Sequence, residues 1–215
     1  VTQPDRPKGR GKIIQPPEVK KIAVEYGLPV VQPERIKDEE FIKKLKSLNL
    51  EFGVVVAYGK IFPKEILTTV EHGFINLHAS LLPKYRGAAP IQWALIKGEK
   101  ITGVTTMLID EGLDTGDVLL QKEVQIEDDD NAQSLSEKLS LIGAELIVET
   151  IDKMRKGIIT PLPQKGEPSY APTLKKEDGR INWRKPARDI LNLIRGTYPW
   201  PCAYCFLKNE RIKII

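Results

Sequence analysis

Apolar and polar positions along the chain follow two periods, one typical of strands and one typical of helices. Strands that alternate with helices predict an α/β fold with a mostly parallel, doubly wound sheet, whose strands are covered on both faces. The sequence predicts strands at residues 28–31, 52–57, 74–78, 104–109 and 118–126, of which 52–57 is continuously apolar. The runs with helical spacing predict helices over 16–26, 38–48 (capped by Asp38) and 131–154, a short helix from Pro63, and another from Gly87 to Lys97.

The pattern changes after residue 158. Four prolines fall within positions 161–172, and this density predicts an extended linker. Beyond it the sequence predicts a helix over 187–195, a strand over 203–207 and a hairpin turn at 208–210. We therefore expect three parts, which are a sheet domain over 1–158, a linker over 159–175, and the beginning of a second, β-rich domain over 176–215.

The composition is that of an ordinary globular protein. Hydrophobic residues make up 41% of the 215 positions, and no apolar run approaches the roughly 18 residues that a membrane-spanning helix needs. Two cysteines and two histidines offer little for a disulfide scaffold or a zinc site, so we expect a reduced, cytoplasmic protein without a metal. The chain begins with Val1 rather than Met and ends within a strand pattern, which predicts a piece of a longer protein.

Positive charge is concentrated at the start of the chain. The net charge is +4, and residues 1–21 hold six basic and two acidic residues, so the rest of the chain is balanced. This segment is rich in proline and glycine, which indicates a basic loop that would attract a phosphate backbone. The alternative is a solvated, flexible terminus without a partner. The four bases that lie closest together are Arg6, Lys8, Arg10 and Lys12.

Two polar residues interrupt the apolar strand predicted at 74–78. Asn76 and His78 are two positions apart, so the alternation of a strand places their side chains on one face of the sheet. They stand at the strand end where open α/β sheets gather their ligands. For His78, a buried histidine with a purely structural role is an equally reasonable alternative.

Two loops bring further chemistry to this strand end. The loop over 80–90 leads into a helix, whose first N–H groups can hold an anion or a developing oxyanion. The loop over 110–117 holds four acidic residues, of which Asp114 is the one expected to face inward and orient the imidazole. An amide, an imidazole and a carboxylate together suit acyl transfer to an amine, with His78 as base and Asn76 as oxyanion donor.

The residues of these loops form a pattern that resembles a known family. The run from Asn76 to Gly87, followed by Leu113-Asp114-Thr115-Gly116, is similar to the signature of the folate-dependent formyltransferases. Residues 1–12, 87–92 and 176–183 also resemble that family, so the likeness covers essentially the whole chain. The resemblance begins after the family's first strand, first helix and most of its second strand, and only the opening of its C-terminal β-barrel domain is present.

The resemblance implies a fold, a reaction and a set of site residues. The fold is a Rossmann-like sheet domain followed by the start of an OB-like, tRNA-binding barrel. The reaction is the transfer of a formyl group from 10-formyltetrahydrofolate to the α-amine of initiator methionyl-tRNA, by a monomer that uses neither a metal nor a membrane. The implied catalytic residues are Asn76, His78 and Asp114, the implied folate-binding residues are Tyr58, Gly59, Ser80, Leu81, Leu82 and Pro83, and the implied tRNA contacts are Arg6, Lys8, Arg10 and Lys12.

Two alternatives stay open beside this interpretation. A relative would use the same donor on a small amine, such as glycinamide ribonucleotide or an amino sugar, although such a substrate needs neither the basic loop nor a second domain. A tRNA-binding piece without catalysis is the other alternative. Within the first interpretation, Tyr58 either lines the folate pocket or packs in the core.

Overall fold

The basic segment near the start of the chain forms a short antiparallel hairpin. Strands β1 (Arg6–Lys8) and β2 (Ile13–Gln15) pair with Arg6 opposite Gln15 and Lys8 opposite Ile13. The structure, a computed structural model, describes residues 1–8, 11 and 13–215, so the predicted tRNA contacts Arg10 and Lys12 lie outside the described residues. The expected basic loop is therefore framed by two short strands that the sequence pattern did not predict.

This hairpin belongs to the first of two units, which comprise residues 1–74 and 75–215. Helix α2 (Glu39–Ser47) buries Phe41 and Leu45, two members of its predicted apolar stripe. Asp38 takes the N-cap position of α2 without a side-chain hydrogen bond, so the prediction is right about the position and wrong about the bond. The other elements of this unit are α1 (Glu18–Glu25), β3 (Gly53–Val56) and α3 (Lys64–Leu67).

Two predictions for the first unit need correction. Residues 28–31 form no strand, since Pro29 carries no N–H for a ladder; the Val31 carbonyl instead accepts a hydrogen bond from the Thr2 N–H at 3.0 Å. Strand β3 forms as predicted, but Val54 and Val56 are 45% and 56% exposed, so it is not covered on both faces. A continuous apolar run indicates that a strand can be buried on both faces, but its burial depends on other segments that pack against it.

The second unit is built on strands β4 (Phe74–His78), β5 (Ile101–Leu108) and β6 (Val118–Gln125), which confirms the predicted α/β class. The pairs β4–β5 and β5–β6 are both antiparallel, where the sequence favoured parallel strands. For β5 and β6 the reason is local, because a short loop over 109–117 joins consecutive strands and can only return the chain in the opposite direction.

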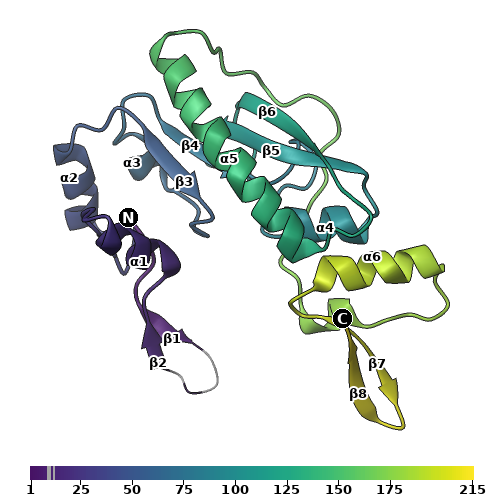
Figure 1. The fold of residues 1–215 in the computed structure, drawn as a ribbon. Helices are drawn as coiled ribbons and strands as arrows, with labels where there is room; N and C mark the ends of the chain where they lie inside the picture. Colours follow the sequence, from purple (N-terminus) through teal and green to yellow (C-terminus); the bar gives the residue numbers. More distant parts are fainter. Residues whose placement is uncertain (9–10, 12) are drawn as a thin grey trace. The chain divides into compact units, whose positions relative to one another are not determined.

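Helix α5 (Ala132–Arg155) runs across one face of these strands (Figure 1). It starts with a capping box, in which Asn131 accepts hydrogen bonds from the N–H groups of residues 133 and 134. The helix approaches the sheet closely at Gly143, where an added Cβ would lie 2.5 Å from the Leu77 side chain. Because Leu77 points toward α5, its neighbours Asn76 and His78 point to the opposite face.

The C-terminal part of the second unit contains a helix and a hairpin. Helix α6 (Ala187–Thr197) packs beside α4 (Pro90–Ile96) (Figure 1), and the approach is close at Gly196, where an added Cβ would lie 2.8 Å from the Gln92 carbonyl oxygen. The predicted hairpin is confirmed, with Lys208 and Asn209 at φ 46° and 69° in its turn. The elements are α4 (Pro90–Ile96), the 3₁₀ helix η1 (Lys176–Gly179), α6 (Ala187–Thr197), β7 (Ala203–Leu207) and β8 (Glu210–Ile214).

The proline-rich segment over 159–172 forms no helix, but it is hydrogen-bonded along the second unit. Leu162 exchanges backbone hydrogen bonds with Val118, at 2.8 and 2.9 Å. Farther on, the Arg86 N–H donates to the Ser169 carbonyl at 2.8 Å, and the Arg86 carbonyl accepts from the Ala171 N–H at 2.7 Å. The linker is thus fixed against loops of the sheet domain, while the domain boundaries at 158 and 175 stay a prediction.

Candidate active site

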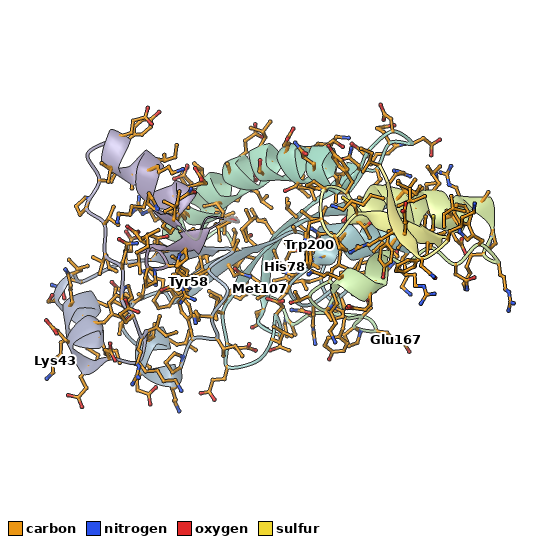
Figure 2. All side chains as sticks on the ribbon, turned by 90° about the horizontal axis from the view of Figure 1, so that it is seen from below. Lys43, Tyr58, His78, Met107, Glu167 and Trp200 are labelled. Carbon is orange, nitrogen blue, oxygen red and sulfur yellow. The ribbon has the colours of Figure 1, made fainter. Side chains whose placement is uncertain are left out.

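Strand β4 places Asn76 and His78 on the face of the sheet that α5 leaves uncovered. In the antiparallel register, Asn76 lies opposite Met107 and His78 opposite Thr105, so the four side chains share this face. Figure 2 shows His78 and Met107 close together on neighbouring strands. His78 is 5% exposed and Thr105 is fully buried, so the imidazole lies at the edge of a packed layer.

The imidazole of His78 is oriented by a backbone carbonyl. Its Nε2 lies 2.9 Å from the carbonyl oxygen of Tyr85. Because a carbonyl can only accept a hydrogen bond, Nε2 carries a proton, and in a neutral imidazole Nδ1 is then the nitrogen with the lone pair. Nδ1 lies 3.7 Å from Oδ2 of Asp114, which is beyond hydrogen-bonding distance. The carboxylate is therefore a nearby charge, whereas the hydrogen bond that sets the ring orientation comes from Tyr85.

Asp114 turns its carboxylate inward from the acidic loop. Its side chain is 14% exposed, and Oδ2 accepts a hydrogen bond from the Gly87 N–H at 2.8 Å. Asp110 is exposed and instead shapes the loop, because it accepts hydrogen bonds from the Gly112 N–H and the Thr115 hydroxyl. The loop over 80–90 and the acidic loop are thus joined at Gly87, beside the imidazole.

Two polar side chains of the sheet, Thr105 and Gln121, form hydrogen bonds with the backbone of the predicted folate loop. The Thr105 hydroxyl donates to the Ser80 carbonyl at 2.6 Å and accepts from the Leu82 N–H at 3.2 Å. The Gln121 amide donates to the Leu82 carbonyl and to Thr105 Oγ1, both at 2.9 Å. Ser80 and Leu82 are buried, and Leu81 and Pro83 are half-buried. These contacts fix the backbone of the loop next to His78.

The other two predicted folate residues lie in the first unit. The Tyr58 ring packs edge-on against Phe62, with centroids 5.8 Å apart. Burial raises the pKa of the Tyr58 hydroxyl. Gly59 is exposed and takes a positive φ of 71°, which favours glycine.

The basic hairpin keeps its surplus charge on four residues. The two acidic residues of the segment are both paired, Asp5 with Lys20 at 2.7 Å and Glu18 with Lys21 at 2.9 Å. Arg6, the first of the four predicted tRNA contacts, is exposed. The excess positive charge of residues 1–21 therefore belongs to the four bases between positions 6 and 12.

Several residues of the site escaped sequence reasoning. The contact of the Tyr85 carbonyl with His78 could not be predicted from the sequence, because every residue type carries a carbonyl. Thr105 and Gln121 left a weak signal as polar residues within strands. Gln164 of the linker also contacts the acidic loop, 50 positions from Asp114.

Across the described residues no group of three or more His, Cys, Asp and Glu side chains could hold a metal ion, and none of the helices there is long and apolar enough to cross a membrane.

Comparison with known proteins identifies the family. The model of the formyl transferase family matches residues 1–151, and that of the formyl transferase C-terminal domain matches residues 173–215. The chain is 75% identical over 215 residues to a methionyl-tRNA formyltransferase from Thermodesulfovibrio yellowstonii, a match that covers 100% of this chain and 70% of that relative.

Two solved structures show the same fold at lower sequence identity. A sugar N-formyltransferase from Shewanella sp FDAARGOS_354 has a TM-score of 0.74 at 23% identity, over 90% of this chain and 78% of that one. WlaRD, a sugar 3N-formyl transferase solved in the presence of dTDP and 5-N-formyl-THF, has a TM-score of 0.70 at 22% identity, over 90% and 68%. The methionyl-tRNA formyltransferase matches all of this chain at 75% identity, against 23% and 22% for the two sugar enzymes. The chain belongs to the methionyl-tRNA formyltransferases of the formyl transferase family.

Proposed function

We propose that this enzyme takes the formyl group from 10-formyltetrahydrofolate and that Asn76, His78 and Asp114 carry out the transfer to the α-amine of initiator methionyl-tRNA. The observation that carries the proposal is the arrangement of the imidazole. Nε2 of His78 is committed to the Tyr85 carbonyl, so Nδ1 is the nitrogen left to exchange a proton, and it lies 3.7 Å from Oδ2 of Asp114. A neutral imidazole whose Nδ1 lies beside a carboxylate is suited to accept a proton.

Each of the three residues has one role in the proposed reaction. The α-amine attacks the formyl carbon, Nδ1 of His78 accepts the proton that the amine loses, and the Asp114 carboxylate stabilises the resulting imidazolium. The Asn76 amide donates a hydrogen bond to the oxyanion of the tetrahedral intermediate. When the intermediate collapses, the bond between the formyl carbon and N10 of the folate breaks, and N10 takes the proton back from the imidazolium.

A folate donor is supported by the structural relatives and by the rigid loop after β4. WlaRD shares the fold and was solved with a formylated folate. In this chain, Ser80, Leu81, Leu82 and Pro83 form a loop held by Thr105 and Gln121 next to His78. We assign this loop to the folate.

The tRNA is assigned to the basic hairpin at the start of the chain. Its surplus charge lies on Arg6, Lys8, Arg10 and Lys12, since the acids of the segment are neutralised by Lys20 and Lys21. Bases at this spacing suit a stretch of phosphate backbone. The OB-like domain that begins near residue 176 is assigned to the same partner, and a cytoplasmic monomer is the expected working form.

A substrate comparison tests the proposal. Formyl transfer from 10-formyltetrahydrofolate is measured with charged initiator tRNA, with glycinamide ribonucleotide and with a nucleotide-linked amino sugar. We expect turnover with methionyl-tRNA alone. Turnover with a small amine would favour the alternative substrate class, and binding of tRNA without formylation would favour a tRNA-binding protein.

A further inference from the structure

The side-chain amide of Gln164 lies between the two loops that frame the candidate active site. Its Nε2 donates hydrogen bonds to the carbonyls of Asp114 at 2.8 Å and Gly116 at 2.9 Å. Its Oε1 accepts hydrogen bonds from Nη2 and Nε of Arg86, at 2.6 and 3.1 Å. A glutamine amide offers two N–H donors and two acceptor lone pairs, so these four hydrogen bonds use its whole capacity.

Asp114 is held at both its backbone and its side chain by this arrangement. The Asp114 carbonyl accepts from Gln164, and the carboxylate accepts from the Gly87 N–H. Gly87 follows Arg86 in the chain, and Arg86 is bound to Gln164, so the contacts close a ring through these four residues. Because no carboxylate contact with the imidazole is shorter than 3.7 Å, the place of the carboxylate depends on this ring.

The backbone of Asp114 needs such support. Its φ is 52°, in the left-handed region that residues other than glycine adopt uncommonly. A conformation of this kind persists where the surrounding contacts determine it. Gln164 supplies the contacts on the carbonyl side of Asp114 and, through Gly116, on the residue that ends the same turn.

We propose that Gln164 is a positioning residue for formyl transfer, which holds Asp114 so that its carboxylate faces Nδ1 of His78. The proposal rests on the roles of His78 and Asp114 proposed above. It gives the linker a function in the reaction, because Gln164 belongs to the segment between the two domains. Displacement of a reacting group by about 1 Å can cost about 100-fold in rate.

The test measures formyl transfer to methionyl-tRNA by variants of the full-length enzyme. Gln164→Leu removes all four hydrogen bonds, and Gln164→Glu keeps an acceptor for Arg86 while it removes both donors to the acidic loop. Gln133→Leu is the matched control, because Gln133 is an exposed residue of α5 whose amide contacts Glu137. We expect both Gln164 variants to lower kcat by about 10- to 100-fold, with KM for methionyl-tRNA within about twofold of the parental value.

A double-mutant cycle shows whether Gln164 acts through Asp114. In an Asp114→Ala background no carboxylate is left to place, so Gln164→Leu should change kcat by less than about threefold. Equal losses in the two backgrounds would overturn the proposal, and so would parental kcat in Gln164→Glu. If Gln164→Leu does not fold, Gln164→Glu enters the same cycle in its place. Parental kcat in Asp114→Ala would instead refute the role proposed for Asp114, which distinguishes the two failures.

Discussion

Thr105 of β5 lies directly opposite His78 of β4, and its hydroxyl donates a hydrogen bond to the Ser80 carbonyl at 2.6 Å. The same hydroxyl accepts from the Leu82 N–H and from the Gln121 amide. One small side chain therefore connects the strand of the candidate base to the loop assigned to the folate. Because Thr105 is fully buried, water cannot replace these hydrogen bonds.

We predict that Thr105→Val destabilises the protein and weakens folate binding. Valine keeps the shape of threonine but leaves the Ser80 carbonyl and the Leu82 N–H without a partner, at a cost of about 1–3 kcal/mol in the free energy of unfolding. For a chain of this size each kcal/mol lowers the midpoint of thermal unfolding by about 2–4 °C. Calorimetry and folate titration measure the two effects. Thr68→Val, at an exposed threonine, is the control, and an unchanged midpoint in Thr105→Val would contradict the prediction.

The chain contains two histidines, which allows a matched comparison. We predict that His78→Ala lowers kcat for formyl transfer by about 100- to 10,000-fold, the usual range for the loss of a positioned base. His72→Ala should leave kcat unchanged, because the His72 side chain is 48% exposed and contacts Phe52 and Glu71 of the first unit rather than any proposed catalytic residue. The affinity for folate, measured by titration, should be similar in both variants. Near-parental turnover in His78→Ala would return His78 to a structural role.

Asp130 should stabilise the protein in a pH-dependent manner. Burial alone would raise the pKa of its carboxyl, but hydrogen bonds from Lys138, the Glu127 N–H and Ser134 outweigh it and lower the pKa below 3.8. A lowered folded-state pKa means that the stabilisation is complete above the unfolded value and is lost as the pH falls through the folded one.

Urea unfolding of the parental protein and of Asp130→Asn at several pH values measures this contribution. We expect the free energy of unfolding to differ by about 1–3 kcal/mol at pH 7 and the difference to shrink below about pH 4. Asp152→Asn, at an exposed residue of α5, should change the free energy by less than about 0.5 kcal/mol. A gap that stays constant down to pH 2 would argue against the charge of Asp130 as its source.

The basic hairpin predicts a salt-dependent tRNA affinity. Each phosphate contact contributes about −0.9 to the slope of log affinity against log salt on a duplex, so Arg10→Ala with Lys12→Ala should flatten the slope by up to about two units. Lys43→Ala with Lys44→Ala removes the same charge from the exposed side of α2 and should leave the slope unchanged. Equal slopes in the two double variants would mean that Arg10 and Lys12 contact no phosphate, and the hairpin would then be a solvated terminus.

Local patterns predicted most of the elements and the polar face of the site. The apolar run at 74–78 matches β4 residue for residue, and the alternation of a strand placed Asn76 beside His78. The spacing over 131–154 predicted α5 to within one residue at each end. These features depend on neighbours within a few positions, which is the range that periodicity covers.

The parts that the sequence did not predict depend on contacts between distant residues. The direction of β4 against β5 is set by pairing across more than twenty positions, which hydrophobic periodicity does not encode. The orientation of His78 comes from a backbone carbonyl, which leaves no trace in residue type. Asp114 was predicted both from its place in the acidic loop and from the family resemblance, but the support of Asp114 by Gln164 required the fold of the linker.

The hydrogen bonds of the linker limit how its length can vary. Gln164 is fixed to the acidic loop, and five positions later the Ser169 carbonyl and hydroxyl are fixed to Arg86 and Tyr85. An insertion between these two points would have to bulge outward, and a deletion would pull one of them off the active-site loops. Related enzymes and engineered fusions should therefore keep the spacing between Gln164 and Ser169.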